Sequence, residues 1–351
     1  NHESLIATKA RRVRTVAPKD ALMEFGLRRA QGHSAGLWGA RAAMIGGFNG
    51  TSNVEAGKRF GIPVLGTMAH SWVMSFDEEI DAFREYVRQY HDNLILLADT
   101  YNVLEMGVPH AIQVFKELKE EGRLPGKYGI RIDSGDIAYL SQEATRMFTE
   151  AGFPDAIISG SNDLDEYTIQ SLKAQGCTVT SWGVGTKIIT ADGTSALGGV
   201  FKMAVKETDG KEVPVMKFSN DVEKMTNPGI KTVYRFYKKD TGKMITDLVC
   251  LHDEKAADGG DFTLVTESAK WRRKELKAGT YTVEELLKPV VENGRNLSLP
   301  ALSEIIRYAD KQIDTLWPEY TRLLNPDLME INLSDKLQTL KSELIRRELG
   351  E

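Results

Sequence analysis

Three short polar segments contain residues that could bind a phosphorylated ligand. The first is Gly183-Val184-Gly185-Thr186, where glycine lets backbone N–H groups approach a phosphate closely and the threonine adds a hydroxyl. The segment is not a GxGxxG fingerprint, because Ile188 stands where the third glycine would be, and no P-loop GK[ST] occurs in the chain. The alternative interpretation is a tight turn that leads into a helix.

The second segment runs from Arg131 to Asp136 and reads Arg-Ile-Asp-Ser-Gly-Asp. If a strand ends here, its alternation points Arg131 and Asp133 in the same direction. This pair could hold an anionic substrate together with a sugar hydroxyl or a divalent metal. The alternatives are a structural ion pair with Asp136 as a helix cap, or Asp133 and Asp136 as a pair of metal ligands.

The third segment, 66–71, contains His70 among small residues where a helix should begin. A histidine in this position can accept a phosphoryl group or act as an acid or base, although a lone histidine is more often a structural hydrogen-bonding residue. The chain has no HExxH, which argues against the familiar zinc protease solution.

A basic loop at 25–32 could contribute to the same site. Phe25 could stack on a flat ring, and Arg28 could pair with an anion. The alternative is an exposed basic turn.

The elements that must position these residues alternate between strand and helix patterns over residues 60–190. The strand-like runs are 63–66, 94–98, 129–132, 156–159 and 178–182, and the helical runs include 78–90 and 108–121. Polar and small residues follow several of the strands, so we expect the site at the carboxyl ends of a parallel sheet in a barrel-like or doubly wound α/β fold.

The pattern changes after residue 195. Antiparallel strands are predicted over 200–206, 213–218, 233–237 and 248–252, and helices over 298–325 and 334–349. We therefore predict an α/β barrel with the active-site rim over 1–200, a β-rich segment over 201–265, and a helical C-terminal region over 266–351.

Composition limits the possible classes of protein. The 351 residues are 41% hydrophobic with a net charge of −5, which argues against general disorder and against a protein that mainly coats nucleic acid. The two cysteines, Cys177 and Cys250, fit a reducing compartment, and no apolar run reaches the length of a membrane span. We expect a cytoplasmic protein without nucleic-acid or membrane partners.

Taken together, the segments resemble the nicotinate phosphoribosyltransferase family. The matching motifs, in family order, are FGLRRAQG at 25–32, GGFNGTSNVEAG at 46–57, GTMAHS at 66–71, ADTYN at 98–102, RIDSGD at 131–136, ISGSND at 158–163 and GVGTK at 183–187. The C-terminal stretch, including residues 270–273, is also similar to that family.

The resemblance implies an irregular TIM-like α/β barrel with an additional α+β region from the C-terminal part. It also implies that nicotinate and 5-phosphoribosyl-1-pyrophosphate (PRPP) give nicotinate mononucleotide and pyrophosphate in NAD biosynthesis, with Mg²⁺ and with ATP hydrolysis coupled to turnover. His70 corresponds to the phosphorylated histidine, and His70, Arg131 and Asp133 to the catalytic group. The implied nicotinate contacts are Phe25, Ser52, Thr67, Ser71 and Arg131. The implied ribose and phosphate contacts are Arg28, Ser134, Gly135, Gly160, Ser161, Gly183, Gly185 and Thr186. The metal ligands stay open.

Two alternatives remain beside this interpretation. Nicotinamide phosphoribosyltransferases, which are similar in layout, have an aspartate where this chain has Ser52, so Ser52 favours nicotinate. A non-catalytic scaffold that binds a phosphorylated ligand would have no need of His70, Arg131 and Asp133 together. Family members also carry an N-terminal segment that supplies an aromatic residue across a homodimer with shared active sites. We find no match to that segment, and expect poor transfer without it.

Overall fold

The computed structural model describes residues 1–219, 224–256, 260–266 and 273–350. Residues 270–272 of the C-terminal resemblance therefore lie outside the described part. The chain divides into two compact units, one with residues 1–197 and 302–309 (unit 1) and one with residues 198–301 and 310–351 (unit 2). In the described residues, no helix combines the length and the apolar character needed to cross a membrane.

Unit 1 is built on a parallel sheet of six strands. The strands are β1 (Ala21–Glu24), β2 (Gly50–Thr51), β3 (Leu94–Leu97), β4 (Tyr128–Ile132), β5 (Ile157–Gly160) and β6 (Ser181–Val184). Their order in the sheet is β2-β1-β6-β5-β4-β3. This is the cyclic order of an α/β barrel that stays open between β2 and β3, so the sheet forms a curled half-barrel.

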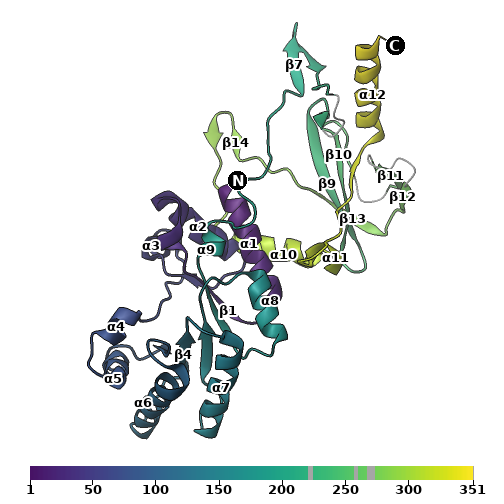
Figure 1. The fold of residues 1–351 in the computed structure, drawn as a ribbon. Coiled ribbons are helices and arrows are strands. Elements are labelled where there is room, and N and C mark those ends of the chain that lie inside the picture. Colours follow the sequence, from purple (N-terminus) through teal and green to yellow (C-terminus); the bar gives the residue numbers. More distant parts are fainter. Residues whose placement is uncertain (220–223, 257–259, 267–272, 351) are drawn as a thin grey trace. The chain divides into compact units, whose positions relative to one another are not determined.

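Helices precede, connect and follow these strands. They are α1 (His2–Val16), α2 (His33–Ile45), α3 (Val54–Phe60), α4 (His70–Met74), α5 (Glu79–Gln89), α6 (Val108–Glu120), α7 (Ile137–Glu150), α8 (Glu166–Ala174) and α9 (Thr186–Ile189), with short turns η1 (Leu27–Arg29) and η2 (Val103–Gly107). Figure 1 shows α6 and α7 side by side along the sheet, and the two helices contact one another.

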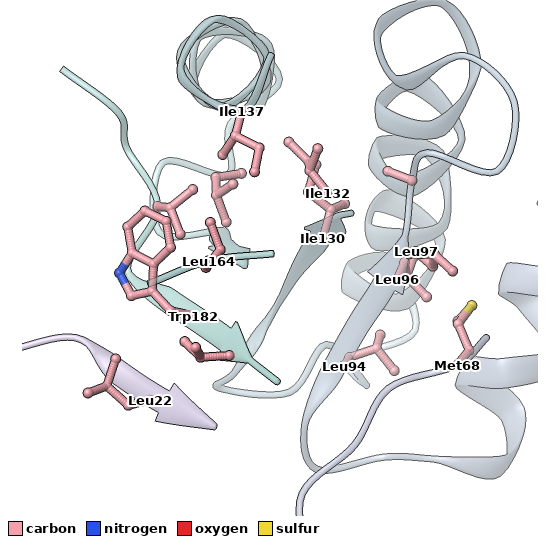
Figure 2. Close-up of a cluster of buried hydrophobic side chains, with 14 of the residues drawn as sticks. Leu22, Met68, Leu94, Leu96, Leu97, Ile130, Ile132, Ile137, Leu164 and Trp182 are labelled. Atoms are coloured by element: carbon pink, nitrogen blue, oxygen red, sulfur yellow. The ribbon is translucent and has the colours of Figure 1, made fainter. Parts of the chain in front are cut away.

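A continuous apolar core holds the sheet and its helices together. Figure 2 shows Leu22 of β1, Trp182 of β6 and the pair Ile130 and Ile132 of β4 within this core. All four side chains are fully buried. The indole N–H of Trp182 donates to Asp20 Oδ2 at 2.7 Å, so this large buried ring also satisfies its polar group.

The predicted βα pattern is confirmed for most of unit 1, with three differences. The strand expected at 178–182 lies later, at Ser181–Val184, because pairing with β1 continues through Gly183 and Val184. The segment expected as a strand at 63–66 makes only one bridge, from Val64 to Thr51, and lies at the opening of the barrel. Strands β1 and β2 were not anticipated, since four and two residues are too short for a period-2 pattern.

Unit 2 contains a second sheet, of mixed direction. Its strands are β9 (Lys231–Lys238), β10 (Met244–Leu251), β11 (Phe262–Thr266), β12 (Arg273–Leu276), β13 (Tyr281–Glu285) and β16 (Ile331–Leu333), in the order β12-β11-β16-β10-β9-β13. The predicted strands 233–237 and 248–252 fall in β9 and β10, which pair antiparallel as expected. A separate core that includes Phe236, Leu248 and Tyr281 packs on this sheet.

Two small hairpins accompany this sheet. Strands β7 (Val205–Thr208) and β8 (Lys211–Pro214) form one, and β14 (Val291–Glu292) and β15 (Arg295–Asn296) the other. The turn between β7 and β8 consists of Asp209 and Gly210, both at positive φ, as the Asp-Gly signal indicates. The strands around this turn are displaced from the predicted 200–206 and 213–218.

The helices near the C-terminus are α10 (Leu302–Thr315), α11 (Pro318–Thr321) and α12 (Asp335–Leu349). Ser334 caps α12 by accepting from the Leu337 N–H, and Gly350 ends the helix at positive φ, as the sequence predicts. The helical region predicted over 266–351 needs correction, however. Residues 273–296 contain β12 to β15, because Gly279 and the pair Asn293-Gly294 adopt positive φ and form strand turns.

Candidate active site

A cleft with a volume of about 390 Å³ opens at the carboxyl ends of strands β1, β4, β5 and β6. Its lining residues all belong to unit 1 and include ten of those predicted from the sequence. These ten are Phe25, Arg28, Thr67, His70, Arg131, Asp133, Ser161, Gly183, Gly185 and Thr186. The expectation that the site lies where the parallel strands end therefore agrees with the cleft.

Arg131 projects into the cleft from β4 as a largely enclosed cation. Its Nη1 donates to Thr67 Oγ1, while its Nε has no hydrogen-bond partner among the described residues. Burial lowers the pKa of the Arg131 guanidinium, and the carboxylates of Asp133 and Asp99 oppose this shift. A guanidinium keeps its proton at neutral pH, so Arg131 offers a fixed positive charge to an anionic group.

Asp133 lies two residues beyond Arg131, directly after β4. Its Oδ1 accepts a hydrogen bond from Ser161 Oγ at the end of β5. Its Oδ2 lies 3.8 Å from His70 Nε2. The carboxylate is thus held from one side and half exposed to the cleft on the other.

His70 is the first residue of α4, as the small-residue run before it predicts. Its Nδ1 lies 3.1 Å from Thr100 Oγ1, which follows β3. If Nδ1 carries the proton and donates to Thr100, then Nε2 presents its lone pair toward the cleft and Asp133. The imidazole is 39% exposed, so a ligand can reach Nε2.

Phe25 fits closely against Gly183 of β6 and against Gly185, which follows this strand. A Cβ placed on Gly183 would come within 2.7 Å of the Phe25 ring, and one on Gly185 within 3.1 Å of the Phe25 carbonyl oxygen. The two glycines therefore allow the Phe25 loop to approach the end of β6. This packing requirement is separate from any role in binding phosphate.

The cleft also contains residues that sequence reasoning did not single out. They are Arg29, Met68, Ala69, Asn162 and Asp163. Asn162 and Asp163 have positive φ of 92° and 37°, a conformation that asparagine and aspartate tolerate better than most residues. The available signal for Asn162 and Asp163 was the polar run that follows β5. In this run, the resemblance implies a role in binding only for Gly160 and Ser161.

Five predicted site residues do not line the cleft. Gly160 is buried against Val179 and Trp182, and Gly135 forms a turn at φ +81°. Ser134 Oγ donates to Asp99 Oδ2 at 2.5 Å, Ser71 is exposed on α4, and Ser52 donates its backbone N–H to the Glu24 carbonyl at 3.0 Å.

The geometry also separates the interpretations of Asp136. This residue caps α7, because its Oδ1 accepts from the Tyr139 N–H at 3.0 Å. Asp136 therefore has the structural role considered for it and, unlike Asp133, does not line the cleft. Among the described residues, no group of three His, Cys, Asp or Glu side chains is arranged to hold a metal ion.

Comparison with protein families gives two matches along the chain. Residues 21–255 match the nicotinate phosphoribosyltransferase (NAPRTase) family, and residues 230–341 match the nicotinate phosphoribosyltransferase C-terminal domain. Together these matches cover both compact units.

Individual relatives agree with the family matches. Over 346 residues the chain is 42% identical to the nicotinate phosphoribosyltransferase of Bacillus subtilis, covering 98% of this chain and 69% of that protein. It is 31% identical to the human nicotinate phosphoribosyltransferase, covering 98% and 72%.

Solved structures also match this fold. The crystal structure of human nicotinic acid phosphoribosyltransferase superposes with a TM-score of 0.81 at 30% identity, covering 98% of this chain and 74% of that one. The nicotinate-nucleotide pyrophosphorylase of Pyrococcus furiosus has a TM-score of 0.67 at 23% identity, covering 90% and 70% of the two chains, which shows a shared fold. The predicted fold class is thus confirmed.

Proposed function

This chain belongs to the nicotinate phosphoribosyltransferase family, and we propose how its cleft carries out the family's reaction. The protein is an enzyme that transfers the phosphoribosyl group of PRPP to nicotinate in NAD biosynthesis. The observation that supports our assignment of the site is the single cleft in which Arg131, Asp133, His70 and the Gly183–Thr186 segment meet.

Nicotinate binds through its two ends. Its carboxylate pairs with the Arg131 guanidinium, which Thr67 orients, and its pyridine ring lies against Phe25. Burial strengthens this charge pair, because few waters compete for the buried guanidinium. A neutral amide would gain less from Arg131 than a carboxylate, and this difference favours nicotinate over nicotinamide.

The phosphoribosyl donor occupies the remaining length of the cleft. Gly185 and Thr186 bind its 5'-phosphate, while Arg28 and Arg29 face its pyrophosphate. The ring nitrogen of nicotinate forms a bond to the ribose C1 as the bond from C1 to the pyrophosphate oxygen breaks. Positive charge develops on the ribose during this step, and the Asp133 carboxylate stabilises it.

Mg²⁺ fits this cleft as an ion held mainly by the donor's pyrophosphate. Among the described residues that line the cleft, Asp133 and Asp163 are the only carboxylates, which suits a cation that keeps most of its ligands from phosphate and water. Bound there, Mg²⁺ would neutralise charge on the leaving pyrophosphate.

The family uses ATP to drive its reaction, and we assign the phosphoryl acceptor to His70 Nε2. Nδ1 is engaged by Thr100, whereas Nε2 faces the cleft. A P–N bond forms to Nε2 as the bond between the γ-phosphorus and the β–γ bridging oxygen of ATP breaks, and ADP leaves. The new phosphate lies close to Asp133 and adds roughly two negative charges, so it changes the affinity of the cleft for anionic substrates.

Two further parts of the proposal concern the enzyme in the cell. We infer a homodimer with shared active sites, as the resemblance implies. A cytoplasmic location is supported by Cys177 and Cys250, both of which are free thiols.

The test is a direct comparison of the two pyridine acceptors. Pyrophosphate release and mononucleotide formation are measured with PRPP and either nicotinate or nicotinamide, for the wild type and for Arg131→Ala. The wild type should prefer nicotinate, and the variant should lose about 10- to 160-fold of that preference, since a hydrogen bond to a charged group contributes about 1.5 to 3 kcal/mol. If Arg131→Ala still prefers nicotinate to the same degree, the carboxylate of nicotinate does not bind to Arg131.

A further inference from the structure

A fully buried carboxylate, that of Glu24, lies directly beside the cleft and is not used by the mechanism. Glu24 is the last residue of β1 and has an exposed fraction of 0%. It immediately precedes Phe25, and the turn η1 with Arg28 and Arg29 follows. Its side chain therefore lies beneath the loop that supplies three residues to the cleft.

Both carboxylate oxygens of Glu24 are engaged by neighbouring donors. Oε1 accepts from the Gly26 backbone N–H, and Oε2 accepts from Thr51 Oγ1 at 2.6 Å. Thr51 Oγ1 in turn accepts from the Asn53 N–H at 3.0 Å, and Asn53 caps α3. The network thus ties the Phe25 loop to β2 and to the start of α3.

A contribution to the stability of the fold does not explain why a carboxylate is buried at Glu24. Burial raises the pKa of the Glu24 carboxyl, and the hydrogen bonds from Thr51 and Gly26 oppose the shift only in part. In the described residues no basic side chain forms an ion pair with Glu24. A buried carboxyl without a cation costs free energy that an apolar residue of similar size would not.

The loop above Glu24 has little freedom to move elsewhere. A Cβ on Gly26 would lie 2.4 Å from Ile189 Cβ and 2.7 Å from Glu24 Oε1, so the backbone at Gly26 passes closely between α9 and the carboxylate. The Phe25 N–H donates to the Val184 carbonyl at 2.9 Å. Glu24 and β6 therefore hold Phe25 from both sides.

We propose that Glu24 is a positioning residue for the acceptor subsite, and that it fixes Phe25 against Gly183 by holding the Gly26 N–H and the Thr51 hydroxyl. The inference rests on the proposed function, because it assigns the ring of nicotinate to Phe25. Glu24 itself touches no substrate.

The test compares Glu24→Ala and Glu24→Gln with a buried carboxylate elsewhere in unit 1. Glu24→Ala removes both acceptors and should raise the KM for nicotinate several-fold, up to about 13-fold, because the stacking of Phe25 is all that it can lose. Glu24→Gln keeps an oxygen for Gly26 and an amide that can donate to Thr51, so its KM should stay within about threefold of the wild type.

Glu166→Gln provides the matched control. Glu166 is as buried as Glu24 but binds Lys9 and Arg12 between α8 and α1, outside the cleft. It should lower the melting temperature and leave the KM for nicotinate unchanged. If Glu24→Ala does not fold, Thr51→Val removes one donor and should still raise this KM.

The outcomes distinguish a failure of the proposed function from a failure of the positioning role of Glu24. A wild type that does not use nicotinate with PRPP contradicts the proposed function. An active wild type whose Glu24→Ala and Thr51→Val variants lose thermal stability without a change in KM overturns the positioning role. Equal loss of nicotinate binding in Glu24→Gln and Glu24→Ala would also overturn it, because the hydrogen bonds would then not be the cause.

Discussion

At the scale of single residues, the cleft sets Asp133 apart from the other acidic side chains around it. Asp136, three residues later, is engaged as a helix cap, and Asp99 is buried and bonded to Ser134. Asp133 alone of these three lines the cleft, where it is held by Ser161. This is why we propose Asp133, and not Asp136 or Asp99, as the carboxylate that acts on the ribose.

We predict that Asp133→Asn lowers kcat more than it raises the KM for PRPP, because a fixed charge contributes most when the ribose becomes cationic. Loss of one such electrostatic group typically lowers kcat by about 10²-fold or more. Steady-state kinetics with varied PRPP measures both constants. Asp136→Asn is the control, since asparagine caps a helix as well as aspartate does. A change confined to KM would assign Asp133 to ground-state binding.

We predict that His70→Ala abolishes ATP hydrolysis and the ATP-stimulated part of turnover, and that some ATP-independent transfer remains. The reason is that, in our proposal, His70 carries phosphate and does not attack the ribose. Acid-labile phosphate on the protein after incubation with ATP should disappear in the variant. Thr100→Val, which keeps the imidazole but removes its partner at Nδ1, should retain a reduced level of phosphorylation. Undiminished labelling of His70→Ala would place the acceptor elsewhere.

From residue patterns alone, the geometry of the site could be predicted only where a local pattern such as strand alternation determines it. Strand alternation was enough to bring Arg131 and Asp133 to one cleft. The contacts of Asp133 with Ser161 and His70 join the ends of β4 and β5 to the start of α4, and no spacing along the chain encodes them. Glu24 was missed for the same reason, because its partner Thr51 lies on a two-residue strand far along the sequence.

At the scale of elements, the site depends on how closely β1 and β6 approach at their carboxyl ends. These strands pair in register from Ala21 with Ser181 to Glu24 with Val184. The Phe25 loop leaves β1 at this point and packs on Gly183 of β6 and on Gly185 just after it. The sequence predicts a glycine-rich loop that starts at Gly183, but Gly183 lies within β6. The prediction differs because periodicity along the chain cannot show where pairing with a distant strand stops.

We predict that Gly183→Ala raises the KM for nicotinate while leaving the fold in place. The added methyl would lie 2.7 Å from the Phe25 ring and must displace it. Stacking of aromatic groups contributes about 0.5 to 1.5 kcal/mol, so the KM should rise roughly 2- to 13-fold. Gly126→Ala is the control, since no described atom lies within 4 Å of the added methyl and the backbone there is not at positive φ. If Gly183→Ala binds nicotinate as well as the wild type does, Phe25 does not belong to the acceptor subsite.

At the scale of the whole molecule, the two compact units have separate apolar cores and contribute differently to the chemistry. Every residue that lines the cleft belongs to unit 1. The sequence indicates a change of texture near residue 195, and unit 2 begins at Gly198. It cannot show that residues 302–309 return to unit 1, because the amphipathic pattern of α10 is the same whichever core it covers.

This separation leads to a prediction about the donor and stability. A ligand that binds only the folded cleft stabilises the structure that holds it, by about 2.7 kcal/mol when its concentration is 100 times Kd. We therefore expect PRPP with Mg²⁺ to slow amide hydrogen exchange in β4, β5, β6 and the Phe25 loop. Strands β9 and β10 of unit 2 should exchange at an unchanged rate, because their core shares no residue with the cleft. Hydrogen exchange measured by mass spectrometry, with and without the donor, gives the rates of both units in the same sample. As a control, Arg28→Ala removes a proposed pyrophosphate contact and should need more donor for the same protection. Equal protection of both units would show that donor binding stabilises the molecule as one cooperative body, and the confinement of its effect to unit 1 would then be wrong.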